Sequence, residues 1–202
     1  MKNLIIGIFL VFIATNPIYS CDDIEIHKKV INYVLDHEGD KILKTKYEYS
    51  KYGIRNSLLR RYNKKNKLNY TIKTLNKEKA TEIALDLMNE YKINKIERCD
   101  VKLIVYDLFY NAGPNAGTLV SQRALNRYHN RDKIDILEDG RMGEETLKHL
   151  NKIEDLKSFI LIFTEERLKY YSSLKNWEKY KNGWKKRINS FFELKELECK
   201  TN

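Results

Sequence analysis

Hydrophobic positions recur at helical spacing near the start of the chain. Ile31, Val34 and Leu35 precede Glu38 by seven, four and three residues, which places all four side chains on one helix face. Gly39 follows at once, and glycine commonly supplies the left-handed residue that ends a helix. The pattern predicts a helix that ends at Glu38, with the Glu38 side chain pointing where the apolar face points.

Later segments keep the same periodicity. After a predicted cap at Asn76, one helix face carries Ala80, Ile83, Ala84, Leu87, Met88 and Tyr91. Residues 101–110 are apolar nearly all round and stop before Gly113-Pro114, which favours a buried central helix over a strand. Pro114 can begin the next helix, since proline is accepted in a first turn.

Three further features complete the predicted architecture. Asp139-Gly140 marks a turn, and two more helices are predicted around Phe159, Phe163, Arg167 and Tyr170 and around Trp184, Ile188 and Phe191. Residues 39–75 lack a helical period and contain a Tyr- and Lys-rich loop, so we predict a small β-hairpin there. The fold class is therefore mainly α, without internal repeats or a long linker.

The first twenty residues have the layout of a secretory signal peptide. Lys2 precedes an apolar run from Leu4 to Ala14, and Ser20 lies just before Cys21. Removing this segment takes away one charge, so the net charge of +10 falls to +9. The mature chain of about 180 residues fits one domain with a sizeable core. We expect an exported protein, periplasmic or secreted, with no stable membrane span.

A strongly basic exported protein suits an acidic polymer. A bacterial wall, an anionic membrane surface and nucleic acid all meet that description, and charge alone does not choose among them. No nucleic-acid motif accompanies the Lys-rich runs, so they are interpreted as solvated faces.

Three cysteines remain after export, which leaves one without a partner in an oxidising compartment. Cys21 is the candidate, because a cysteine at this position resembles a lipoprotein cleavage site, although Tyr19 is bulky for one. Simple secretion is favoured over a lipid anchor. Cys99 and Cys199 are then left to pair.

Other chemistries find less support. The four histidines lie in separate segments without ligand spacing, so neither a metal nor another cofactor is expected. Cys99 is better suited to a structural disulfide than to nucleophilic catalysis. Asp107 interrupts an apolar helix with Asn111 one turn later. This pair either satisfies a buried polar network or lines a cleft.

Glu38 is the candidate for acid catalysis. Partial burial and the negative end of the helix dipole both favour its protonated form, which a general acid requires. The simpler interpretation is a helix-end glutamate in solvent.

Several separated segments resemble the glycoside hydrolase 108 family, lysozyme-like peptidoglycan hydrolases of phages and Gram-negative bacteria. In chain order they are His37-Glu38-Gly39, Tyr52-Gly53-Ile54, the run from Tyr106 to Pro114 with Gln122-Arg123-Ala124-Leu125-Asn126, Asp139-Gly140-Arg141-Met142-Gly143 with Thr146, and Arg167-Leu168-Lys169-Tyr170-Tyr171 with Gly183-Trp184 and Arg187. Each motif is weak alone, but together they cover nearly the whole mature chain.

The resemblance implies a lysozyme-like helical fold and an N-acetylmuramidase, a glycosidase of the bacterial cell wall. The substrate is the bond between N-acetylmuramic acid (MurNAc) and N-acetylglucosamine (GlcNAc), and Glu38 matches the catalytic acid. The implied organisation is a signal peptide over residues 1–20, a catalytic region over 21–113 and a peptidoglycan-binding region over 114–202. We expect a monomer whose partner is peptidoglycan.

A second group must manage water on the other face of the sugar, and its candidates are Glu48, Asp40 and Ser50. Asp40 replaces a usual second glycine, Ser50 replaces a usual threonine, and the loop before Tyr52 is shortened. Predicted sugar contacts are Tyr52, Asp107, Asn111, Gln122 and Arg123. The alternatives are a non-catalytic wall-binding or secretion-assisting protein, and a basic protein that disrupts membranes through an amphipathic tail over residues 177–192.

Overall fold

The first predicted helix forms as the apolar stripe requires. The computed structural model describes residues 24–46, 48–129 and 135–191, and α1 (Ile24–Glu38) buries Val34 and Leu35 and ends at Glu38. Gly39 follows with φ of +72°, and its N–H donates to the Leu35 carbonyl at 3.0 Å. The predicted helix end is therefore confirmed.

A small antiparallel sheet follows α1. It has the order β1 (Leu43–Lys44), β2 (Tyr49–Lys51) and β3 (Ile54–Arg55). In its register Leu43 faces Ser50, and Ser50 faces Arg55. The predicted hairpin is present, with one more strand than expected.

Helix α2 (Asn56–Asn66) begins directly after β3 and was not predicted. Only Leu59 is buried in it, so its sequence carries no apolar period. By contrast, α3 (Lys77–Glu90) begins where expected, because the Asn76 side chain accepts a hydrogen bond from Lys79 N at 3.0 Å.

The rest of the described chain is helical. In order, its elements are η1 (Ile93–Lys95), α4 (Cys99–Ala112), α5 (Pro114–Tyr128), α6 (Glu144–Asn151), α7 (Leu156–Ser172) and α8 (Trp177–Asn189). The predicted buried helix is α4, where every residue from 99 to 109 except Asp100 is buried. Proline starts α5 as predicted, whereas α6 was not foreseen.

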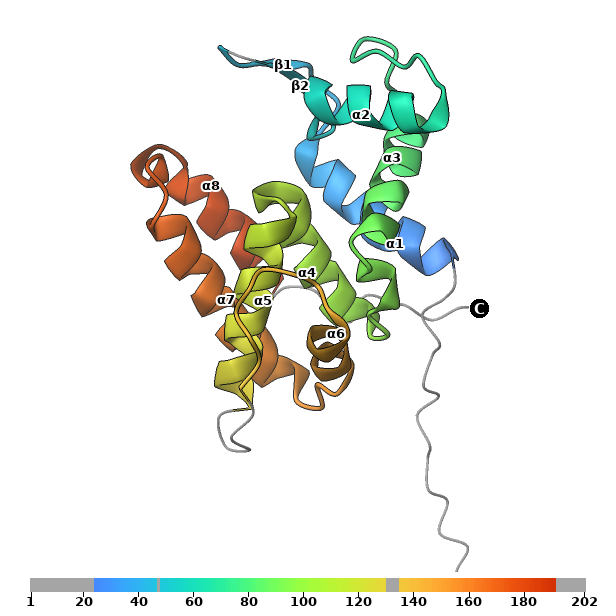
Figure 1. The fold of residues 1–202 in the computed structure, drawn as a ribbon. Coiled ribbons are helices and arrows are strands. Elements are labelled where there is room, and N and C mark those ends of the chain that lie inside the picture. The colour runs from blue at the N-terminus through green and yellow to red at the C-terminus, as the bar shows by residue number, and fades with distance from the viewer. Residues whose placement is uncertain (1–23, 47, 130–134, 192–202) are drawn as a thin grey trace, which may run out of the picture.

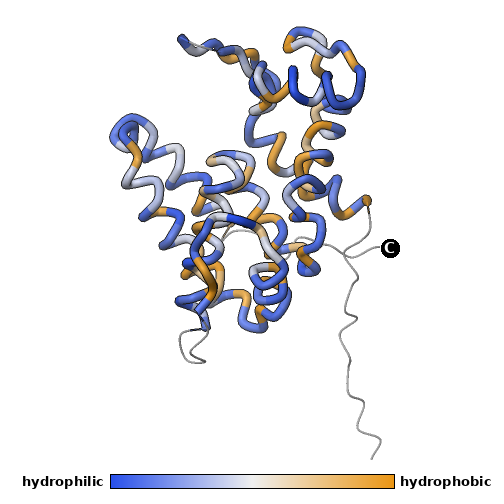
Figure 2. The backbone as a smooth tube through the Cα atoms, in the orientation of Figure 1, coloured by the Kyte–Doolittle hydropathy of each residue, from blue (hydrophilic) through white to orange (hydrophobic). Residues whose placement is uncertain are grey.

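Helix α4 is the central element. It packs against α1, α5 and α7, while α5 packs on α7 and α7 on α8. In Figure 1 the sheet, α2 and α3 lie above α4, and α5 to α8 lie below it and to its left. Hydrophobic positions concentrate along α1, α3 and α4, whereas α8 is largely hydrophilic (Figure 2).

Some sequence predictions fall outside the described residues. The signal peptide, Cys21 and Cys199 belong to this group. Cys99 is disulfide-bonded, so its structural role is confirmed, while the pairing with Cys199 stays a prediction. Within the described residues, no helix combines the length and apolarity needed to cross a bilayer.

The packing of α1 can be tested at Leu35, which is 1% exposed. Leu35→Ala should lower the free energy of unfolding by about 2–5 kcal/mol, because a buried leucine leaves a cavity. Asp36→Ala on the exposed side should cost less than about 1 kcal/mol, since its ion pair with Lys77 is solvent-exposed. Urea unfolding measures both. Equal losses would contradict this orientation of α1.

Candidate active site

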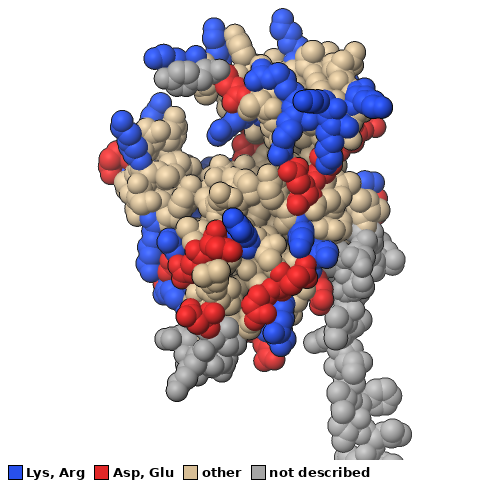
Figure 3. Space-filling view, in the orientation of Figure 1, with Lys and Arg blue, Asp and Glu red and all other residues tan. Residues whose placement is uncertain are grey.

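A cavity of about 410 Å³ lies where the end of α1, the sheet and the end of α4 meet. Its lining includes Glu38, Ser50, Gly53, Arg55, Arg61, Tyr106, Tyr110 and Asn111. The molecular outline is indented on the side where the sheet and the outer end of α8 face each other (Figure 3).

Glu38 forms a close ion pair with an arginine from the other end of the chain. Arg187 Nη1 on α8 donates to Glu38 Oε1 at 2.6 Å, and the two side chains are 13% and 19% exposed. Among the described residues, Glu38 Oε2 accepts no hydrogen bond. Glu38 is thus partly buried, as predicted, with a cationic partner that was not.

Arg187 is itself held by a fully buried carboxylate, Asp107. Arg187 Nε and Nη2 approach Asp107 Oδ1 at 2.9 and 2.7 Å, and Arg167 Nη2 donates to Oδ2 at 2.7 Å. Burial acts to raise the pKa of Asp107, but the two guanidinium groups hold that pKa below its usual range. Burial likewise opposes the charge of Arg187, yet Asp107 and Glu38 raise its pKa.

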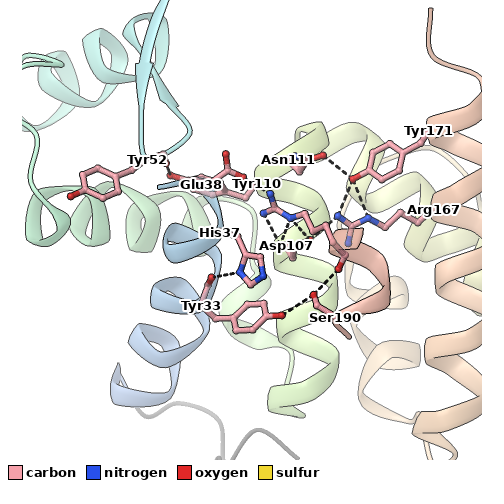
Figure 4. Close-up of polar contacts among 11 residues, drawn as sticks. Tyr33, His37, Glu38, Tyr52, Asp107, Tyr110, Asn111, Arg167, Tyr171 and Ser190 are labelled. Atoms are coloured by element: carbon pink, nitrogen blue, oxygen red, sulfur yellow. Dashed lines mark hydrogen bonds and ion pairs between the residues drawn. The ribbon is translucent and has the colours of Figure 1, made fainter. Parts of the chain in front are cut away.

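The polar network continues to the cavity through Tyr171. The Tyr171 hydroxyl accepts from Arg167 Nε at 3.1 Å and donates to Asn111 Oδ1 at 2.7 Å (Figure 4). Asn111 also lines the cavity. Of the two roles left open for the Asp107 and Asn111 pair, Asp107 therefore serves the buried network, and Asn111 joins that network to the cavity.

The turn between β2 and β3 presses against Glu38. Gly53 has φ of +73°, and a Cβ there would lie 2.6 Å from Tyr110 Cε1 and 3.1 Å from Glu38 Oε2. The Tyr110 hydroxyl donates to the Tyr52 carbonyl at 2.8 Å. Burial raises the pKa of Tyr110, as do Tyr106 and Glu38, so this hydroxyl remains a donor.

The other predicted residues near Glu38 occupy different positions. Ser50 lines the cavity, whereas Glu48 is half-buried outside the lining, and its Oε1 accepts from Ser57 N at 2.5 Å at the start of α2. Hydrogen bonds from Ser57 lower the pKa of Glu48. Asp40 is exposed and is not among the lining residues. The Tyr52 ring points away from Glu38 (Figure 4).

Gln122 and Arg123 lie away from this cavity. Gln122 is 1% exposed, donates to Asp139 Oδ1 at 2.9 Å and accepts from Gly140 N at 2.9 Å, so it holds the turn before α6. Arg123 pairs with Glu138 at 3.1 Å beside a separate hollow on the surface. The structure therefore does not bring these two side chains to Glu38.

Several residues of the site were missed by sequence reasoning. They are Gly53, Tyr110, Arg167, Tyr171 and Arg187. A signal for them existed, because each falls within a segment that carries the family resemblance. No local pattern, however, links Arg187 to a carboxylate 149 residues earlier.

Comparison with known proteins supports the fold. No family model and no curated protein matches the chain. The solved structure of Brucella abortus SagA matches with a TM-score of 0.65 and 19% sequence identity, covering 84% of this chain and 92% of that one. The chain thus shares the fold of a solved bacterial protein over most of the length of both.

The charge network can be tested through Asp107. Asp107→Asn should lower the free energy of unfolding by about 3–5 kcal/mol, because it leaves the buried Arg167 without its counter-charge and leaves Arg187 with Glu38 alone. Because the folded-state pKa of Asp107 is depressed, its stabilisation is complete above its unfolded pKa, near 3.8, and is lost as pH falls below that value. Stability of the variant, measured by urea unfolding, should therefore depend less on pH below about 4 than stability of the wild type. Parallel pH dependences would contradict the assigned ion pairs.

Gly53→Ala tests the tight turn. We expect a loss of at least about 1–2 kcal/mol in the free energy of unfolding, because a left-handed residue with a Cβ is strained and the new methyl group meets Tyr110. Gly143→Ala is the matched control, since its φ is negative and its Cβ would meet no atom within 4 Å. Both are measured by thermal unfolding. A loss no larger than that of the control would refute the contact.

Proposed function

We propose that this protein is a peptidoglycan glycosidase, an N-acetylmuramidase that cleaves the MurNAc–GlcNAc bond with Glu38 as general acid. The observation that carries the proposal is the placement of Glu38. Its carboxyl group lines the cavity, Arg187 anchors one oxygen, and the other oxygen accepts no hydrogen bond within the described residues. Export to the periplasm or the medium would bring the protein to this substrate.

The positions of the matched segments in the fold support the family resemblance. Four of the five matched segments contribute to one connected site: Glu38 from the first, Gly53 from the second, Asp107, Tyr110 and Asn111 from the third, and Arg167, Tyr171 and Arg187 from the fifth. The fourth is tied to the third through Gln122 and Asp139. Residues matched only by sequence order thus interact in space.

The proposed reaction begins with proton transfer from Glu38. With the proton on Oε2, Glu38 donates it to the glycosidic oxygen as the bond from that oxygen to C1 of MurNAc breaks. A water molecule then attacks C1, and its surplus proton passes to solvent. Of the three candidates for the second group, Ser50 is the one that lines the cavity, and we assign its hydroxyl the role of holding that water.

Arg187 has a second partner when Glu38 carries a proton. Protonation weakens the ion pair, but Arg187 keeps its contacts with Asp107 at 2.7 to 3.1 Å. Asp107 then serves both guanidinium groups, so Arg187 keeps a carboxylate partner when Glu38 is neutral, although two cations share one counter-charge. The network therefore permits the protonated state that acid catalysis needs.

A non-catalytic peptidoglycan-binding or secretion-assisting protein is the second candidate. The observation that favours it is the same ion pair, because Arg187 already occupies one of the two carboxyl oxygens of Glu38. The presence of Asp40 where the family usually has a glycine also favours the non-catalytic candidate. This candidate expects binding to the wall without cleavage.

Digestion of purified peptidoglycan separates the two candidates. The wild type should release muropeptides with reducing-end MurNAc, identified by mass spectrometry, and Glu38→Gln should lower turnover by at least about 10²-fold because an amide cannot donate the proton. Asp36→Asn, an exposed carboxylate on the same helix, should keep wild-type turnover. Sedimentation with the wall measures binding in each case.

The outcomes are distinct. Release by Glu38→Gln at the wild-type rate would remove Glu38 from the reaction. Binding without release by the wild type would favour the non-catalytic candidate.

A further inference from the structure

The positive charge of the chain is concentrated in one segment. Residues 39–75 contain eleven Lys and Arg against two Asp and Glu, an excess of nine, and the whole chain has a net charge of +10. This segment forms the sheet and α2. Lys and Arg gather over this upper part of the molecule, whereas Asp and Glu are more frequent below it (Figure 3).

Two of these cations line the cavity that contains Glu38. They are Arg55, the last residue of β3, and Arg61 on α2, with Leu58 between them in the lining. We call Arg55 and Arg61 the cationic wall. Ser50 pairs directly with Arg55 in the sheet, so the wall adjoins the residue to which we assign the water.

The two arginines differ in how far they are already paired. Arg61 Nη1 donates to Glu90 at 3.0 Å, and its side chain remains 51% exposed. Arg55 is exposed and forms no ion pair within 4 Å with any described residue. Its guanidinium group has donors in the fork geometry that suits a carboxylate.

We infer that the cationic wall binds a carboxylate of the peptide stem attached to MurNAc. The inference rests on the proposed function and narrows its substrate to peptide-bearing, anionic strands. A neutral glycan offers only hydroxyl and amide partners, whereas a carboxylate forms charge-assisted and bidentate hydrogen bonds with arginine. The stem leaves the sugar at the lactyl group of MurNAc, so a cavity that holds the scissile bond also receives the start of the stem.

Arg60 supplies a matched control within the same helix. It is exposed, carries the same charge as its neighbour Arg61 and does not line the cavity. Its loss removes one charge from the segment and leaves the cationic wall intact. Arg55→Lys supplies the conservative variant, because lysine keeps the charge but loses the bidentate geometry.

The test compares two soluble substrates with the same glycan strand. One carries native peptide stems, and in the other the stem carboxylates are converted to neutral amides. For the wild type, kcat/KM should be about tenfold higher on the native strand than on the amidated strand. A tenfold difference is what one hydrogen bond to a charged group is expected to contribute. The difference should shrink as salt is added.

The variants locate the effect. Arg55→Gln should bring cleavage of the native strand close to that of the amidated strand, Arg55→Lys should restore part of the difference, and Arg60→Gln should retain it. Equal cleavage of both strands by the wild type would overturn the inference and leave the proposed function standing. A similar loss in Arg55→Gln and Arg60→Gln would indicate general attraction to polyanions and would also overturn it. Cleavage of neither strand would instead count against the proposed function.

Discussion

The carboxylate of Asp107 is the point on which the site depends. It is fully buried on α4, and the two arginines that neutralise it come from α7 and α8. One of them, Arg187, extends to Glu38 at the end of α1. A single buried charge therefore connects four helices. Such an ion pair is weak evidence for high stability, since desolvation offsets much of the attraction, but it joins side chains from helices that are far apart in the sequence.

This arrangement explains why the site includes residues from both ends of the described chain. Glu38 is near the start of the described part and Arg187 is near its end, yet the two side chains meet because α4 packs against α1 and α7, and α7 packs on α8. The region expected to bind the wall, residues 114–202, thus supplies a side chain that touches the proposed acid. Catalytic and C-terminal regions are coupled through charge as well as through packing.

The local sequence pattern predicted two kinds of element. These are helices with one buried apolar face, and helices whose first or last residue is marked by a capping residue, glycine or proline. The end of α1 at Gly39, the cap at Asn76 and the start of α5 at Pro114 all followed from residues next to one another. Helix α2 was not predicted, because it buries only Leu59 and its sequence therefore shows no helical period of apolar residues.

Prediction of the site from the sequence has the same limit. Glu38 and Asn111 were identified from their own surroundings and Ser50 from the family resemblance, whereas the partnership of Arg187 with Glu38 exists only after distant helices pack. Gln122 was predicted to contact sugar but holds the turn at Gly140, and the sequence alone does not separate these two roles.

The two sides of the cavity differ in how firmly they are built. On one side, Glu38 is held by Arg187, and Arg187 by a carboxylate that no solvent reaches. On the other side, β1 is exposed, α2 buries one side chain, and the arginines of the cationic wall extend toward solvent. A sequence change on the second side disturbs few buried contacts, and the departures from the family pattern, at Asp40 and in the loop before Tyr52, fall there. The position of the proposed acid is therefore insulated from changes in the surface that would select the substrate. Selectivity in a protein built this way can change through the sheet and α2 while the buried network keeps Glu38 in place.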